Sequence, residues 1–153
     1  MKLNTTSAVI SFAKELEETS IKYYENLIQK YPQNKEIFLS FIKENKKNMI
    51  SVQRVYQEVI TDAIEGCFSF EGLETNNYKF DADLSTKTNY TEALKNAIEV
   101  EEKIQKYYSD SAEMSKSLMA DIPRVFERIA KKRDKRKIKI KDRWTINLYY
   151  KDF

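Results

Sequence analysis

The sequence contains no histidine, one cysteine, two glycines and two prolines among its 153 residues. Without histidine it has no imidazole base, no Ser-His or Cys-His nucleophile and no histidine ligand for zinc or iron. Gly66 and Gly72 alone do not suffice for a GxGxxG turn or a P-loop. The single Cys67 excludes an intrachain disulfide and a cysteine-based zinc or iron–sulfur site. Most common catalytic and cofactor motifs are therefore absent.

Long hydrophobic runs are also missing. No apolar stretch approaches the roughly 18 residues of a membrane span. The N-terminal segment Met1–Asn4 leads into glutamate-rich sequence rather than an apolar signal region. Together with the one unpaired thiol, these features lead us to expect a cytoplasmic protein without membrane association. The length suits a single domain with one hydrophobic core.

Charge is unevenly distributed along the chain. Residues 124–143 contain eleven Lys and Arg against three acidic residues, whereas the remainder contains sixteen basic and twenty-one acidic residues. The sequence thus predicts an acidic body with a basic end. Within that end, the candidate contacts for nucleic acid or another polyanion are Lys131, Lys132, Lys135, Lys137 and Lys139. We favour a solvated helix end, where cations complement the helix dipole, and do not expect nucleic acid as a partner.

Apolar side chains recur at helical spacing over four long stretches that almost lack glycine and proline. The first predicted helix begins near Thr6 or Ser7, either of which could cap it, and ends at about residue 31. The second follows Pro32 and continues to about Gly66. The third begins between Asn89 and Thr91 and ends at about Met114. The fourth follows a cap at Asp121, with a proline in its first turn, and continues to about residue 141.

Two other segments lack this spacing. Residues 67–89 predict a long crossover between the second and third helices, with short extended pieces. In residues 142–153, alternating Trp144, Ile146 and Leu148 predict an extended, strand-like tail. We therefore predict an all-α four-helix bundle over residues 1–141, followed by a tail that packs on the bundle or on a second subunit.

The helices contain an internal repeat. The pattern Ala-x3-Glu-x6-Tyr occurs in the first helix and again in the third, at Ala13, Glu17 and Tyr24 and at Ala97, Glu101 and Tyr108. The second and fourth helices align with an offset of 88, which places Asn45 on Arg133 and Asn48 on Arg136. Because both matches occur in chain order at similar offsets, 84 and 88, we infer a duplicated helix pair.

Residues 11–24 and 93–108 resemble the first and third helices of the rubrerythrin group of the ferritin-like superfamily, and the resemblance extends over about residues 7–141. In that family the first and third helices each contribute a metal-binding Glu, and the second and fourth each contribute Glu-x-x-His. Positions i and i+3 share a helix face, so these side chains converge on two irons. The resemblance implies a ferritin-like four-helix bundle.

The family's ligand positions fall on six residues of this chain: Glu17, Asn45, Asn48, Glu101, Arg133 and Arg136. Neither histidine remains and two of the four carboxylates are gone, so the resemblance implies a lost di-iron site, with no catalytic residue and no cofactor. In its place we expect an internal cluster in which each arginine binds one carboxylate and the two amides fill the remaining positions. The competing possibility is that both arginines point to solvent with the rest of the basic run.

The preferred function is a non-catalytic structural or interaction role, as a homodimer with an unknown further partner. One alternative is a metal-binding oxidoreductase with a rearranged carboxylate site, in which the two remaining glutamates hold iron or manganese with Glu18, Glu44 or Glu102. These neighbours lie about 100° around their helices from the ligand positions, which weakens this alternative. A second alternative is a nucleic-acid-binding module that uses residues 131–143.

Overall fold

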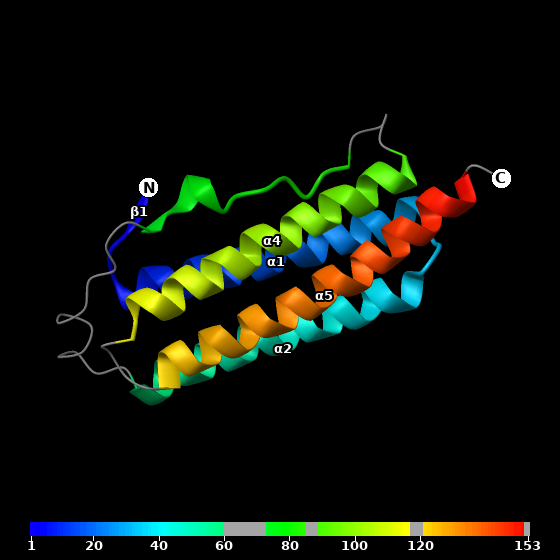
Figure 1. Cartoon of the computed structure of the whole chain (residues 1–153). Coiled ribbons are helices and arrows are strands. Elements are labelled where there is room, and N and C mark those ends of the chain that lie inside the picture. Colours follow the sequence, from blue (N-terminus) through cyan, green and yellow to red (C-terminus); the bar gives the residue numbers. More distant parts are fainter. Residues whose placement is uncertain (60–72, 85–88, 117–120, 152–153) are drawn as a thin grey trace.

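The computed structural model describes residues 1–59, 73–84, 89–116 and 121–151. These residues form four long α-helices: α1 (Thr6–Lys30), α2 (Lys35–Val59), α4 (Tyr90–Met114) and α5 (Asp121–Lys151). The helices lie side by side along one axis, with α1 antiparallel to α2 and α4 antiparallel to α5 (Figure 1). For the described residues, the prediction of an all-α fold with four long helices in this order is confirmed.

Local signals set the helix ends. Thr5, one residue before the predicted position, caps α1 because its hydroxyl accepts a hydrogen bond from the backbone N–H of Ala8 at 3.1 Å. Asn89 caps α4 in the same way. Asn34 adopts a positive φ of 61° between α1 and α2, a conformation that asparagine tolerates better than most residues. The predicted end of the second helix at Gly66 lies outside the described residues.

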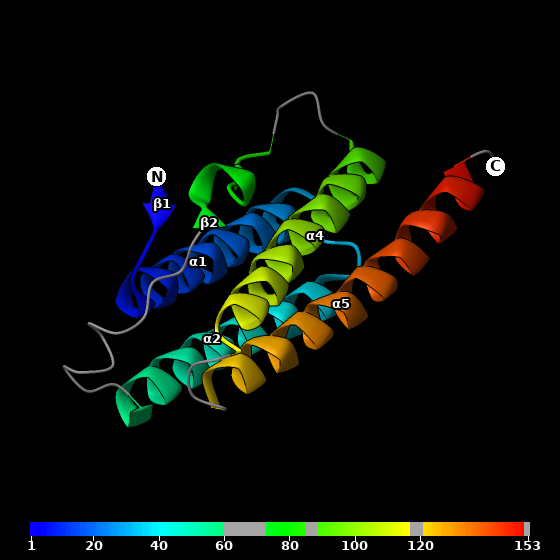
Figure 2. The same cartoon turned by 60° about the vertical axis from the view of Figure 1, so that its left-hand side comes forward.

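The crossover between α2 and α4 is described over residues 73–84. This segment runs along α1 and α4, on the side of the molecule away from α2 (Figures 1 and 2). It contains the predicted short extended piece, strand β2 (Leu73–Glu74), which pairs antiparallel with β1 (Lys2–Leu3). Cys67, in the earlier part of the crossover, lies outside the described residues.

The prediction of a strand-like tail over residues 142–153 is wrong. Helix α5 continues without interruption to Lys151. Ile146 and Leu148, which the alternation would place on a buried face, are 46% and 37% exposed. Of these apolar residues, the half-buried Trp144 packs against the core. No glycine or proline follows in the described part of α5, so nothing in the local sequence ends the helix.

Contacts between α1 and α4 reproduce the sequence repeat. The hydroxyl of Tyr23 donates to the carbonyl oxygen of Ala93 at 2.7 Å, and that of Tyr107 donates to the carbonyl oxygen of Val9 at 2.6 Å. The two tyrosines differ by 84 positions, and so do the two residues that accept their hydrogen bonds. The two halves of the chain therefore pack on each other in equivalent ways.

In the described part of the chain, none of the helices has a stretch apolar enough to cross a lipid bilayer.

Candidate functional site

All six residues at the family's ligand positions lie in the centre of the bundle. Each is at most 2% exposed, and they come from all four helices: Glu17 from α1, Asn45 and Asn48 from α2, Glu101 from α4, and Arg133 and Arg136 from α5. The glutamates face inward because each occupies the apolar stripe of its helix. Both arginines lie in the core rather than in solvent. We call the two glutamates and the two arginines the ion cluster.

Arg133 joins both carboxylates of the ion cluster. Its Nη1 donates to both carboxylate oxygens of Glu101, at 2.9 and 3.0 Å, and its Nη2 donates to Oε2 of Glu17. Nη1 also lies 3.2 Å from the hydroxyl oxygen of Ser20. A planar guanidinium presents several donors in fixed directions, so one arginine can bridge α1 and α4.

Arg136 has a different environment. Its Nε donates to Oε1 of Glu44 at 2.8 Å, and its Nη2 donates to the carbonyl oxygen of Phe41 at 3.0 Å. Its Nη1 lies 3.5 Å from Oε1 of Glu101, and its Cζ lies 5.0 Å from the ring centroid of Phe41, within the range of a cation–π contact. Each arginine therefore pairs with a glutamate of the ion cluster, but the pairing is not one to one. Arg133 binds both glutamates, and Arg136 contacts Glu101 at the longer distance while it binds the half-buried Glu44 more closely.

Two tyrosines complete the hydrogen bonding of the glutamates. The hydroxyl of Tyr108 donates to Oε1 of Glu17 at 2.8 Å, and the hydroxyl of Tyr24 donates to Oε1 of Glu101. Both tyrosines belong to the sequence repeat, but the repeat alone carries no signal that pairs them with the glutamates. The pairing depends on the crossing of α1 and α4, which places each tyrosine beside the glutamate of the other helix.

The two asparagine amides of α2 donate fewer hydrogen bonds to the glutamates than expected. Nδ2 of Asn48 donates to Oε1 of Glu17 at a long 3.4 Å, and Nδ2 of Asn45 donates to the hydroxyl oxygen of Ser20 at 3.0 Å. Asn45 therefore reaches the ion cluster through a serine. Among the described residues, the side-chain oxygens of both asparagines and Nε of Arg133 have no hydrogen-bond partner.

Burial and ion pairing shift the pKa values of Glu17 and Arg133 in opposite directions. Burial raises the pKa of Glu17 above its ordinary range, although Arg133 and Arg136 oppose this shift. For Arg133, burial alone would lower the pKa, but the carboxylates of Glu101 and Glu17 raise it, so the guanidinium stays charged. Burial also raises the pKa values of Tyr24 and Tyr108, which therefore act as neutral hydrogen-bond donors.

The raised pKa of Glu17 predicts the pH dependence of stability. A carboxyl group whose pKa is higher in the folded chain stabilises the fold most below its ordinary pKa of 4.5 and loses this effect as the pH rises toward the folded value. Urea unfolding from pH 4.5 to 7 should show the native protein losing stability relative to Glu17→Gln. The exposed Glu18→Gln is the control and should track the native protein. If the native protein instead gains stability relative to Glu17→Gln over this pH range, the pKa of Glu17 is not raised in the folded chain.

The residues of the cluster do not suit a divalent metal. Guanidinium groups offer no lone pair and repel a cation, and Arg133 and Arg136 occupy two of the six positions. Of the neighbours considered for a rearranged site, Glu18 and Glu102 are exposed, and Glu44 pairs with Arg136. Within the described ranges, no group of three or more His, Cys, Asp or Glu side chains is arranged to hold a metal ion.

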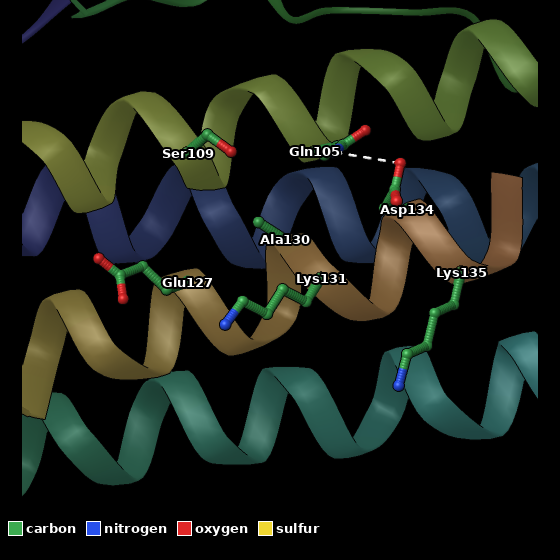
Figure 3. A pocket seen from close by; sticks show the side chains of 7 residues that line it. All are labelled: Gln105, Ser109, Glu127, Ala130, Lys131, Asp134 and Lys135. Atoms are coloured by element: carbon green, nitrogen blue, oxygen red, sulfur yellow. Dashed lines mark hydrogen bonds between the residues drawn. The ribbon is translucent and has the colours of Figure 1, made fainter.

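The lysines of the basic run lie outside the ion cluster. Lys131, Lys135 and Lys139 are exposed, and Lys132 and Lys137 are half-buried. Lys131 and Lys135 border a shallow groove between α4 and α5, which Glu127 and Asp134 also line (Figure 3). This groove mixes both signs of charge, so it is not a specific site for an anion.

Burial limits what the ion cluster can do. Its four charged side chains are at most 2% exposed, and they approach the surface through Glu44, whose side chain is 35% exposed. At this depth the four groups contact side chains of neighbouring helices.

No family model matches the chain, and neither a curated protein nor a solved structure matches it.

Proposed function

We propose that this chain is a rubrerythrin-like member of the ferritin-like superfamily in which the ion cluster takes the place of the di-iron site. One observation carries the proposal. The six positions assigned from the family's spacing are scattered over four helices, yet all six are buried in the core of the bundle. Five of them are linked directly by hydrogen bonds or ion pairs, and Asn45 is linked through Ser20, which Arg133 also contacts.

The role that we propose is structural or interactive rather than catalytic, in a cytoplasmic homodimer. Loss of both histidines and two carboxylates removes the groups with which the family holds its metals, and two buried arginines oppose a cation at the same positions. Exposed Ile50 and Ile138 occupy equivalent positions on α2 and α5, 88 residues apart, and are 58% and 52% exposed. These two side chains are the contacts that we propose for a second copy.

Metal content tests the loss of the di-iron site. After expression with excess iron, manganese and zinc, elemental analysis should give less than about a tenth of an equivalent of each metal per chain, because the ligand set is incomplete. About one or two equivalents per chain, lost in Glu17→Ala and Glu101→Ala but kept in the exposed control Glu18→Ala, would contradict the proposal and support the rearranged carboxylate site.

A further inference from the structure

In the folded chain, one side of the bundle has an excess of basic residues and the opposite side has an excess of acidic residues. Helices α2 and α5 contain seventeen Lys and Arg against seven Asp and Glu, whereas α1 and α4 contain six against ten. The segment 73–84, which lies over α1 and α4, adds one lysine and three acidic residues. Helices α2 and α5 lie together on the opposite side (Figures 1 and 2). The basic segment is therefore one long side of the bundle and not an end of it.

On α5 the basic residues form a straight row, which we call the basic stripe: Arg128, Lys132, Lys135, Lys139 and Arg143. Steps of three and four residues keep the five side chains on one side of the helix, over about 22 Å at 1.5 Å per residue. The flank of α5 that carries Glu127 and Asp134 lines the groove with α4. In Figure 3 the side chain of Lys135 extends away from α4, toward the side on which α2 lies.

Two exposed lysines of α2 lie beside the basic stripe of α5. Arg136 of α5 contacts Phe41 and Glu44, so this part of α2 runs directly beside the middle of α5. Lys43 and Lys47 lie one turn apart in the same part of α2, and both are exposed. We call the basic stripe together with these two lysines the basic face. None of its seven residues forms an ion pair with another described residue.

We propose that the basic face binds the phosphate backbone of double-stranded nucleic acid without sequence specificity. A rigid row of cations at regular spacing matches a regular polyanion, and counterion release drives such binding. Contacts of lysine and arginine with phosphates carry no sequence information, so base reading is not part of this proposal. Single-stranded sites add aromatic platforms for stacking, but Tyr149 is the one large aromatic side chain exposed among the described residues, and it lies beyond the basic stripe.

This inference supplies a partner for the interaction role proposed above, but it rests on surface charge and not on the ion cluster. For residues 131–143, linear sequence favours a solvated helix end over nucleic-acid binding. The folded chain favours nucleic-acid binding, because the basic charge extends along a whole face that includes α2.

The test is fluorescence anisotropy of the full chain with a labelled duplex of mixed sequence at increasing NaCl. About four phosphate contacts give a log–log salt slope near −3.6, so affinity should fall about 150-fold between 50 and 200 mM salt. The triple variant Lys132→Gln, Lys135→Gln, Lys139→Gln should bind about tenfold or more weakly and reduce the slope by about two to three.

The matched control is Lys22→Gln, Lys79→Gln, Lys95→Gln, which removes the same charge from exposed positions of the opposite side and should bind as the native protein does. An equal loss of affinity in both triple variants would overturn the proposal. So would no duplex binding at 20 mM salt, tighter binding to a single strand, or binding to phosphatidylserine vesicles without binding to duplex. Metal content does not depend on these lysines, so failure here leaves the ion-cluster proposal untouched.

Discussion

Arg133→Met is expected to destabilise the fold by about 3–5 kcal/mol in urea unfolding at pH 7, because it leaves two buried carboxylates without their shared cation. Among the described residues, Arg133 alone contacts both Glu17 and Glu101. Arg136 remains 3.5 Å from Glu101, but Glu17 keeps only hydrogen bonds from Tyr108 and Asn48, which cannot neutralise its charge. The cost should decrease as the pH is lowered toward 5, because the buried Glu17, whose pKa is raised, can then bind a proton.

Two further variants separate charge from packing. Lys135→Met makes the same kind of change two residues along α5 at an exposed position, and should shift stability by no more than about 0.5 kcal/mol. Adding Glu17→Gln and Glu101→Gln to Arg133→Met should recover part of the loss, because no carboxylate then remains buried. A cost below about 1 kcal/mol for Arg133→Met, typical of surface ion pairs, would mean that the ion cluster does not hold the helices together.

Metal binding is expected to appear when the four missing ligands are restored. The variant Asn45→Glu, Asn48→His, Arg133→Glu, Arg136→His completes two Glu-x-x-His pairs around Glu17 and Glu101, and should bind about two equivalents of iron or manganese per chain. Without metal this variant places four carboxylates in the core, so unfolding temperature should rise strongly on metal addition. Metal content and unfolding temperature are therefore both measured.

The matched control places the same four residue types at exposed positions of the same two helices, as Lys43→Glu, Lys46→His, Lys135→Glu, Ile138→His. Each pair keeps the spacing of three residues, but the pairs do not face the bundle core. Equal metal binding by the control would show that the residues act as isolated surface pairs. A restored variant that neither binds metal nor gains stability from it would contradict the assignment of the ligand positions.

The sequence by itself determined the helices and the residues of the core site. Apolar side chains at steps of three and four, with almost no glycine or proline, specify helices locally. The repeat then placed Glu17 opposite Glu101 and aligned Asn45 and Asn48 with Arg133 and Arg136. These features depend on spacing along one helix or on equivalence between two helices, and both can be read from linear sequence.

Only the tertiary structure decided which groups meet. Glu44 reaches Arg136, and each tyrosine of the repeat reaches the glutamate of the other helix, because helices far apart in the chain cross at these points. The period-two pattern around Trp144 predicted a strand, but in the described residues no helix-breaking residue interrupts α5 there. The basic face likewise exists only after folding, because long-range packing sets Lys43 and Lys47 beside a stripe almost ninety residues later in the chain.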